Sequence, residues 1–262
     1  MKPSRRLRRF FSSVPLEGTG MLVELDPAET SHLKSTLRLK EGDRCRVTDG
    51  LGNEAVAQVK SFSAAGKCSL EIERMESGSE ESSNPGLVLN LYVGIPQRGK
   101  MDTLVEKAQE LGVRRLQPLE TERSVVKMAE AQKAKVLLRW QKIAREAAKQ
   151  SGVSRLVHVD RPVGFREALG QIGAGETGVL FHPDEGAIAY KDWIRSWQEE
   201  SKGAKGGPGP LHFFIGPEGG FTDGEVRMAL AGNLKKVHLG GTLLKVDTAF
   251  LAVVAVMKLV GE

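Results

Sequence analysis

The residues best placed to do chemistry lie in a glycine-rich turn near the carboxyl end of the chain. An apolar run over residues 211–215 breaks there on Gly216-Pro217-Glu218-Gly219-Gly220, and glycine allows backbone conformations that are closed to other residues. A ligand can therefore approach bare backbone at this turn. Glu218 is the one carboxylate in it, and this side chain can accept a proton, orient a substrate base, or cap a backbone amide.

Short-range patterns predict the elements around this turn. Thr222-Asp223-Gly224-Glu225 matches a capping box, so a helix should begin at Thr222. A short strand over residues 236–239 leads to a second glycine turn, Gly240-Gly241, and then to a nearly all-apolar run over residues 248–260, for which Asp247-Thr248 fits an N-cap. Parallel sheets bind ligands at the carboxyl ends of their strands, so we expect the two glycine turns to form one pocket.

Seven blocks of sequence occur in the order found in one known family. They are RRFF at 8–11, HLKSTLRLKEGD at 32–43, KAQELGV at 107–113, ERSVVK at 122–127, WQKIAREAAKQSG at 140–152, LFHP at 180–183, and GPEGGFT at 216–222 with the following LGGTLLKVDTA and apolar helix. They resemble the RsmE family of SPOUT methyltransferases. The resemblance implies S-adenosylmethionine (SAM) as the methyl donor, N3 of a uridine in 16S ribosomal RNA of the small ribosomal subunit as the acceptor, and a homodimer.

The expected fold class is α/β with two domains. Residues 1–80 contain short alternating strands and the hairpin signals Asp49-Gly50 and Gly52-Asn53, and the resemblance identifies this β-rich module as a PUA-like RNA-binding barrel. Residues 76–86 are polar and Ser-rich, which is linker composition. Residues 86–262 alternate apolar strands with helices, as in a domain with a mainly parallel sheet. The resemblance implies that this second domain contains the SPOUT trefoil knot.

The site residues are predicted from the strand ends, the glycine turns and the resemblance. SAM is expected on Leu180, Phe181, His182, Ile215, Gly216, Gly219, Gly220, Leu239, Leu243 and Leu244. The candidate catalytic residues are Glu218, Lys245 and Asp247, and Glu218 is expected to promote loss of the uridine N3 proton or to orient the base. The five histidines show no metal-ligand spacing, so no metal is expected, and His212 and His238 are more typical of packing residues.

Positive charge is concentrated at the amino end. The net charge is +5, and Lys2 with the arginines of residues 5–9 carries as much, which favours contact with RNA or an anionic membrane. Phe10 and Phe11 argue against a frayed tail, because adjacent aromatic rings need burial or stacking. The predicted RNA-binding residues are Arg5, Arg6, Arg8, Arg9, Arg98, Lys100, Arg123 and Lys127.

Several positions depart from the family pattern. Thr242 and Lys245 stand where arginine is common, Asp247 where glutamate is common, and Val153 where an arginine follows the long helix, with Arg155 as a candidate substitute. These changes leave open a non-catalytic RNA-binding or ribosome-assembly factor on the same fold.

Two other classes of protein are disfavoured. Residues 94–101, GIPQRGKM, nearly spell a phosphate-binding P-loop, but Met101 lacks the magnesium-binding hydroxyl and Pro96 lacks an N–H. The run over residues 248–260 is shorter than the roughly 20 residues that span a bilayer. Cys45 and Cys68 are too few for a disulfide framework and are expected to be buried. We therefore expect a cytoplasmic protein without a membrane partner.

Overall fold

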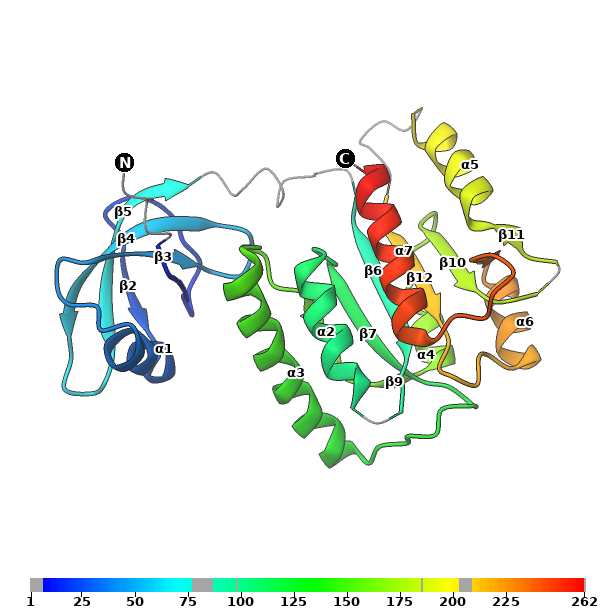
Figure 1. The fold of residues 1–262 in the computed structure, drawn as a ribbon, viewed down its shortest axis with the longest axis horizontal. Helices are drawn as coiled ribbons and strands as arrows, with labels where there is room; N and C mark the ends of the chain where they lie inside the picture. Colours follow the sequence, from blue (N-terminus) through cyan, green and yellow to red (C-terminus); the bar gives the residue numbers. More distant parts are fainter. Residues whose placement is uncertain (1–6, 77–86, 98, 185, 203–208, 262) are drawn as a thin grey trace. The chain divides into compact units, whose positions relative to one another are not determined.

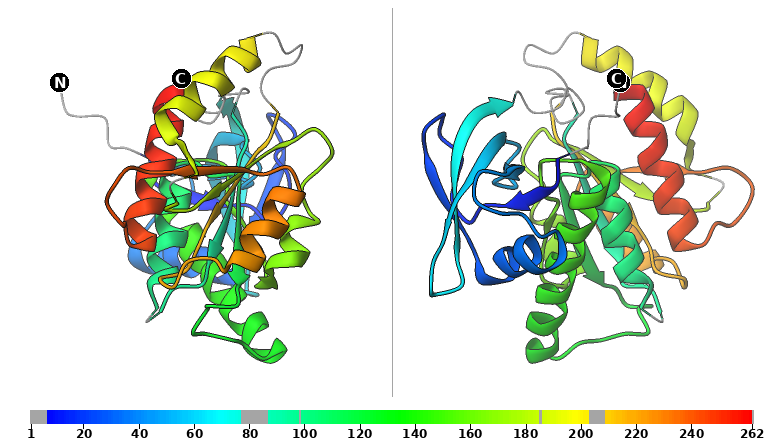
Figure 2. Two further views of the ribbon diagram at one scale, coloured as in Figure 1. Left: turned by 90° about the vertical axis from the view of Figure 1, so that its right-hand side faces the viewer. Right: turned by 60° about the vertical axis from the view of Figure 1, so that its left-hand side comes forward.

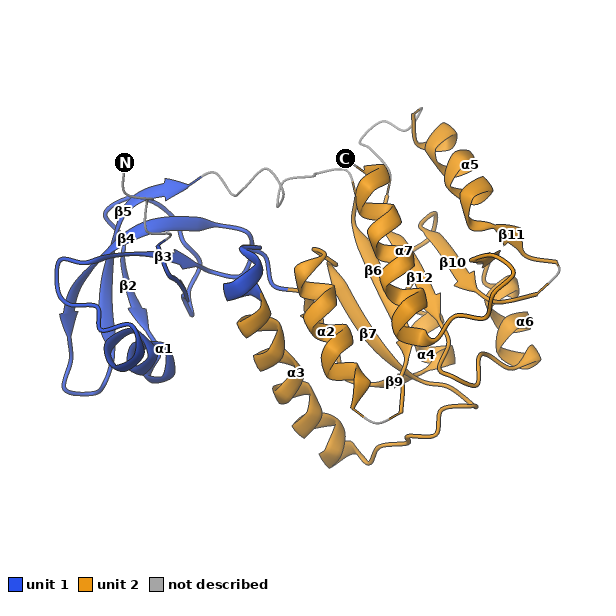
Figure 3. Ribbon diagram, viewed as in Figure 1, with its two compact units in different colours: residues 1–83, 148–156 blue, residues 84–147, 157–262 orange. Residues whose placement is uncertain are grey.

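The chain forms two compact units in a computed structural model that describes residues 7–76, 87–97, 99–184, 186–202 and 209–261. The first unit comprises residues 1–83 and 148–156, and the second comprises residues 84–147 and 157–262 (Figure 3). Most of the predicted linker, residues 77–86, lies outside the described residues. No pattern in the sequence indicates that residues 148–156 join the first unit.

The first unit is the predicted β-rich module. Its five strands form one sheet in the order β1-β3-β4-β5-β2, with two short helical segments between β2 and β3 (Figure 1). The elements are β1 (Arg9–Phe11), β2 (Leu22–Leu25), α1 (Pro27–Ser31), η1 (His32–Thr36), β3 (Arg44–Thr48), β4 (Glu54–Phe62) and β5 (Cys68–Glu76). Gly50 and Gly52 both have positive φ in the predicted turn between β3 and β4.

Both cysteines are buried in the core of this unit, as predicted. Burial raises the pKa of Cys45 to about 12 and that of Cys68 to about 11. The thiolate is the reactive form, so both thiols stay protonated and act as small apolar side chains.

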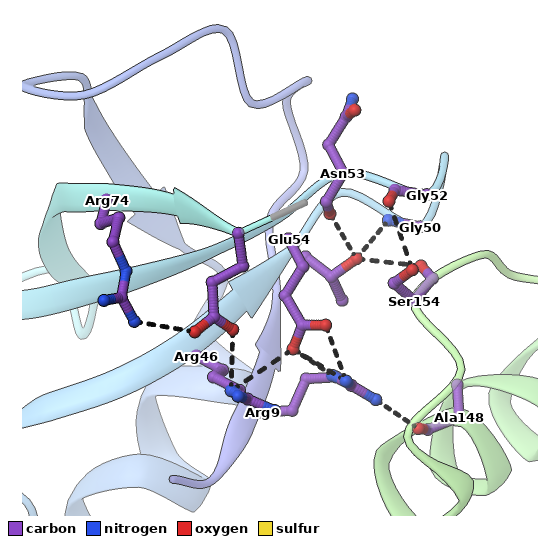
Figure 4. A network of polar contacts seen from close by, with 11 residues as sticks. Arg9, Arg46, Gly50, Gly52, Asn53, Glu54, Arg74, Ala148 and Ser154 are labelled. Atoms are coloured by element: carbon purple, nitrogen blue, oxygen red, sulfur yellow. Dashed lines mark hydrogen bonds and ion pairs between the residues drawn. The ribbon is translucent and has the colours of Figure 1, made fainter. Parts of the chain in front are cut away.

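Arg9 is a buried structural residue, which corrects its predicted role in RNA binding (Figure 4). Its guanidinium donates to both carboxylate oxygens of Glu54, at 2.8 and 2.9 Å, and to the carbonyl oxygen of Ala148 at 3.2 Å. The Arg9 and Glu54 side chains are only 6% and 4% exposed. Phe10, next to Arg9, is also fully buried, so residues 9–11 form a packed strand and not an RNA-binding tail.

Residues 148–156 are held to the first unit by polar contacts (Figure 4). The Thr48 hydroxyl donates to the Ser154 carbonyl oxygen at 2.9 Å, and the Ser154 hydroxyl donates to the Gly52 carbonyl oxygen at 3.2 Å. Lys149 forms a largely buried ion pair with Glu29 at 2.6 Å. These partners are about 100 residues or more apart in sequence, which is why local patterns did not predict them.

The second unit is an α/β domain in which every strand pairing is parallel. The order of the main path is β11-β13-β10-β12-β6-β7-β8, and β9 pairs with β7. The strands are β6 (Leu89–Gly94), β7 (Arg115–Glu120), β8 (His158–Val159), β9 (Val163–Gly164), β10 (Thr177–Phe181), β11 (Ile188–Ala189), β12 (Leu211–Ile215) and β13 (Lys235–His238). The predicted parallel sheet is confirmed. The trefoil knot stays a prediction.

Helices cover both faces of this sheet (Figure 2). One core lies under α2 (Lys100–Glu110), α3 (Glu130–Ser151), α5 (Tyr190–Lys202) and α7 (Val246–Gly261), and the opposite core lies under α4 (Phe165–Leu169) and α6 (Asp223–Ala231). The last turn of α3 belongs to the first unit. Among the helices of the described residues, none is long and apolar enough to cross a membrane.

Replacement of Arg9 tests its structural role. Arg9→Met should lower the free energy of unfolding of the first unit by about 3 kcal/mol, because the buried Glu54 carboxylate loses its hydrogen-bonded partner and keeps only Arg46, 3.8 Å away. Arg8→Met is the matched control, since Arg8 is exposed and its loss should change that free energy by less than about 0.5 kcal/mol. Native-state hydrogen exchange of the β4 amides measures both. Equal protection in the two variants would contradict the assignment.

Candidate cofactor and substrate site

A cavity of about 360 Å³ lies at the carboxyl ends of β10, β12 and β13, which are neighbours in the sheet. Three loops form it, one from each strand end, together with the start of α7. The lining residues are Phe181, His182, Pro183, Ile215, Gly216, Pro217, Glu218, Gly220, Phe221, Leu239, Gly240, Thr242, Leu243, Leu244, Lys245, Val246 and Ala249. The two glycine turns therefore contribute to one pocket at the predicted edge of the sheet.

The cavity offers apolar walls and free backbone groups. Its sides are mostly aliphatic and aromatic carbon, from residues such as Leu239, Leu243 and Leu244. The backbone N–H and C=O groups of residues 242–244 make no hydrogen bonds to other described residues. Apolar surface with a few polar backbone groups is the common composition of small-molecule and cofactor sites. The residues present therefore fit a cofactor such as SAM.

His182 also lines the cavity. Its Nδ1 is buried and has no hydrogen-bond partner among the described residues. Burial lowers the pKa of His182, although the nearby Asp184 carboxylate opposes this effect. The imidazole is consequently neutral at neutral pH.

The glycine turn is held from the side opposite the cavity by the loop that follows β6. A Cβ atom on Gly94 would lie 2.4 Å from both the backbone N and the Cδ of Pro217, so only glycine allows this approach. Three residues further on, the Gln97 N–H donates to the Glu218 carboxylate at 3.2 Å. Glu218 thus has the amide-capping contact that the sequence left open, and it also lines the cavity.

The segment that follows β7 also holds the glycine turn, through hydrogen bonds from Arg123. Arg123 donates from Nη1 to the carbonyl oxygens of Gly219 and Phe221, at 3.0 and 3.3 Å. The predicted capping box at Thr222 is confirmed, with Glu225 Oε2 accepting from the Thr222 N–H at 2.9 Å. The other oxygen of Glu225 accepts from the Glu122 N–H at 2.9 Å. The turn and the start of α6 are therefore both attached to residues 122–123.

Eight of the ten predicted cofactor residues line the cavity, and two do not. Leu180 points to the opposite core, because successive side chains of a strand face opposite sides and Phe181 takes the cavity side. Gly219 faces Arg123, whose Cβ would lie 3.1 Å from a Cβ at that position. Leu180 and Gly219 therefore do not line the cavity, which corrects their predicted contact with the cofactor.

The three catalytic candidates are placed differently. Glu218 and Lys245 line the cavity, whereas Asp247 does not. Helix α7 begins at Val246, so Asp247 lies in its first turn and is not the predicted N-cap. Its carboxylate is 3.7 Å from the Lys100 ammonium, in a half-exposed ion pair. Asp247 therefore has a structural partner and favourable placement near the helix N-terminus.

The RNA-binding candidates that the structure describes differ in exposure and in their partners. Arg5, Arg6 and Arg98 lie outside the described residues. Arg8 and Lys127 are exposed, Lys100 is paired with Asp247, and Arg123 is bound to the glycine turn. Arg155, the candidate substitute for the family arginine, lies against Gly52 in the first unit.

The residues that sequence reasoning missed are Gly94, Gln97 and Glu122. Only Gly94 had a visible signal, a glycine directly after an apolar strand. The other two act through backbone N–H groups, which every residue except proline has, so their side-chain identity carries no signal.

Comparison with known proteins defines the class first. The family described as "RNA methyltransferase domain" matches residues 83–258, and the one described as "RNA methyltransferase PUA domain" matches residues 25–72. The predicted α/β fold class with a PUA-like amino-terminal module is thereby confirmed.

Individual relatives then specify the family. A Synechocystis protein named "Ribosomal RNA small subunit methyltransferase E" is 31% identical over 233 residues, covering 87% of this chain and 69% of the relative. The Bacillus subtilis protein of the same name is 28% identical, covering 84% and 83%. The crystal structure of the Neisseria gonorrhoeae protein bound to S-adenosyl methionine is 28% identical with a TM-score of 0.79, covering 97% of each chain. The chain belongs to the ribosomal RNA small subunit methyltransferase E family.

Gly94 allows a test of the support beneath the glycine turn. Gly94→Ala should displace Pro217 and weaken SAM binding about tenfold or more, because overpacking of this kind costs about 1–3 kcal/mol. Gly164→Ala is the matched control, since no atom lies within 4 Å of its added Cβ. Calorimetric titration with SAM measures affinity, and thermal unfolding verifies that both variants are folded. Unchanged affinity in folded Gly94→Ala would show that the turn does not depend on this contact.

Proposed function

We propose that this protein transfers the methyl group of SAM to N3 of a uridine in the 16S ribosomal RNA of the small ribosomal subunit. The observation that carries the proposal is the cavity at the ends of β10, β12 and β13, formed by two glycine turns in a member of this family. The related protein from Neisseria gonorrhoeae binds S-adenosyl methionine, and the curated relatives carry small-subunit ribosomal RNA in their names. Such a substrate places the activity in the cytoplasm.

The cavity residues are proposed to hold the donor in one orientation. Phe181, Leu239 and Leu244 would provide apolar contacts to the donor, and the backbone groups of residues 242–244 would be available to hydrogen-bond with it. SAM, when bound, supplies a methyl group on a sulfonium that is already a good leaving group. The main task of the protein is therefore to hold donor and acceptor in line, which is an effect of orientation.

We propose that the Glu218 carboxylate faces the acceptor base. It is exposed and lines the cavity, so an incoming base can reach it. Methylation at N3 removes an imide proton, which a carboxylate at that position accepts or directs to water. The Gln97 N–H holds the same carboxylate in one orientation. Lys245, also on the lining, is proposed to contact the RNA at the mouth of the cavity.

We also propose that the protein acts as a homodimer that buries the outer side of α7. Leu251, Val256 and Leu259 on this helix are exposed, with Leu259 at 74%, although the helix is almost entirely apolar. Leu243, on the cavity loop just before α7, is 77% exposed. A self-complementary contact across a twofold axis would cover these side chains in both copies.

The class of activity is tested by transfer of labelled methyl from SAM. We expect incorporation into small-subunit ribosomal RNA from a strain that lacks the enzyme, and 3-methyluridine in the nuclease digest by mass spectrometry. RNA binding without incorporation, for both naked RNA and assembled subunits, would favour the non-catalytic alternative.

The role of Glu218 is tested by a pair of substitutions. If its carboxylate acts as a base, Glu218→Gln should lower turnover by about 100- to 10,000-fold with little change in SAM affinity. If the carboxylate only accepts the Gln97 N–H, Glu218→Gln should remain active, because the amide oxygen can accept the same hydrogen bond, and only Glu218→Ala should lose activity. Single-turnover rates and SAM titrations of both variants separate the two roles.

The dimer is tested at Leu259. Leu259→Asp should weaken dimerisation by roughly 100-fold or more, because a buried leucine contributes about 1.5–3 kcal/mol and a twofold interface loses two of them. Leu230→Asp, on the exposed side of α6, is the control and should leave the dissociation constant of the dimer unchanged. Sedimentation equilibrium measures both. A wild-type monomer at all concentrations would refute the proposed dimer.

A further inference from the structure

The loop between β7 and α3 presents two unusual side chains to solvent. We refer to residues 121–128 as loop 121–128. Val125 is 71% exposed, and Lys127 is exposed without an ion-pair partner among the described residues. No packing or charge contact in the described chain accounts for either side chain.

Loop 121–128 is fixed at both of its ends. At the start, the buried Ser124 hydroxyl accepts from the Thr121 N–H at 3.0 Å and lies 2.9 Å from the Thr121 hydroxyl. At the end, the Glu120 carboxylate accepts from the Met128 N–H at 3.0 Å, and Lys133 pairs with the same carboxylate at 3.0 Å. The Lys133 and Glu120 side chains are only 12% and 18% exposed, so water weakens this ion pair little.

The first part of the loop is also attached to the cofactor turn, residues 216–220. Arg123 donates to the carbonyl oxygens of Gly219 and Phe221, and the Glu122 N–H donates to Glu225. The opposite side of this turn lines the cavity through Gly216 and Gly220. Loop 121–128 therefore lies next to the reaction site, separated from it by the turn itself.

An exposed valine on a fixed loop has a physical consequence. A mobile loop would lose conformational entropy on binding a partner, but here hydrogen bonds at residues 121–124 and at Met128 hold the backbone on both sides of residues 125–127. The apolar surface of Val125 is available for contact, and Lys127, two residues away, supplies a positive charge beside it. An unpaired RNA strand presents this combination, with apolar base faces next to phosphates.

We propose that loop 121–128 is a preformed RNA-contact surface of the second unit. In this assignment Val125 packs against an unpaired base or ribose next to the target nucleotide, and Lys127 binds a backbone phosphate. Arg123 is a positioning residue, which fixes the distance between this surface and the cofactor turn. The inference rests on the proposed function and adds to it the part of the protein that places the RNA.

Arg123 and Lys127 are both cations of the ERSVVK segment, but the proposal gives them different roles. The guanidinium of Arg123 is committed to two carbonyl oxygens, whereas the ammonium of Lys127 is free to meet a phosphate. Loss of Lys127 should therefore change RNA binding, and loss of Arg123 should change SAM binding.

Filter binding and steady-state kinetics with naked small-subunit ribosomal RNA test the assignment. Lys127→Gln should weaken RNA affinity about three- to tenfold and reduce the slope of log affinity against log salt by about one. Val125→Thr replaces one methyl group with a hydroxyl and keeps the shape of the side chain. It should raise KM for RNA severalfold with little change in kcat. The affinity of both variants for SAM should equal that of the wild type. Arg123→Gln should give the reverse pattern, with weaker SAM binding and an unchanged salt slope.

The controls are exposed residues on other helices of the same unit. Lys191→Gln on α5 and Leu230→Ala on α6 should leave RNA affinity unchanged. Wild-type RNA affinity and KM in both the Lys127 and Val125 variants would overturn the proposal, and so would losses seen only with assembled subunits, which indicate a ribosomal protein as partner. Failure of the wild type to transfer methyl groups refutes the proposed function alone, because RNA affinity is measured independently of transfer.

Discussion

The site depends on one close approach between two backbones. Residues 216–220, which follow β12, can approach the end of the adjacent β6 only because Gly94 at that end has no side chain. Any Cβ there would overlap with Pro217. Because the φ angle of Pro217 is fixed by its ring, the position of this proline also restricts the backbone of the residues on either side. The placement of Glu218 and of the other lining residues of this turn therefore depends on the contact between Gly94 and Pro217.

The order of strands in the sheet explains how the site is divided. The carboxyl ends follow one another as β13, β10, β12, β6 and β7. The first three supply the cavity, and the loops after β6 and β7 support the glycine turn from the other side. Because β12 lies in the middle, its turn contacts both groups. A parallel sheet achieves this arrangement through hydrogen bonds from adjacent loops.

Patterns that depend on neighbouring residues were predicted well from the sequence, and directions in space were not. The capping box at Thr222 and the parallel sheet follow from spacing and periodicity, and the structure confirms both. Charge counting placed Arg9 on an RNA-binding tail, because the sequence does not show that Glu54 meets it 45 residues later. Gly219 was assigned to the ligand because a turn of several glycines does not reveal which one faces the cavity. Both errors concern a partner or an orientation that only tertiary structure determines.

The electrostatics of the cavity suit a positively charged donor. A histidine on the lining would repel a sulfonium if it were protonated, but burial lowers the pKa of His182 and keeps its imidazole neutral above that value. As pH falls through the lowered pKa, the ring gains a charge inside the cavity, and the site becomes less favourable for a cation. The other two ionisable groups on the lining, Glu218 and Lys245, are exposed, so water and salt weaken their fields. The half-buried His182 is therefore the group through which pH acts most directly on this cavity.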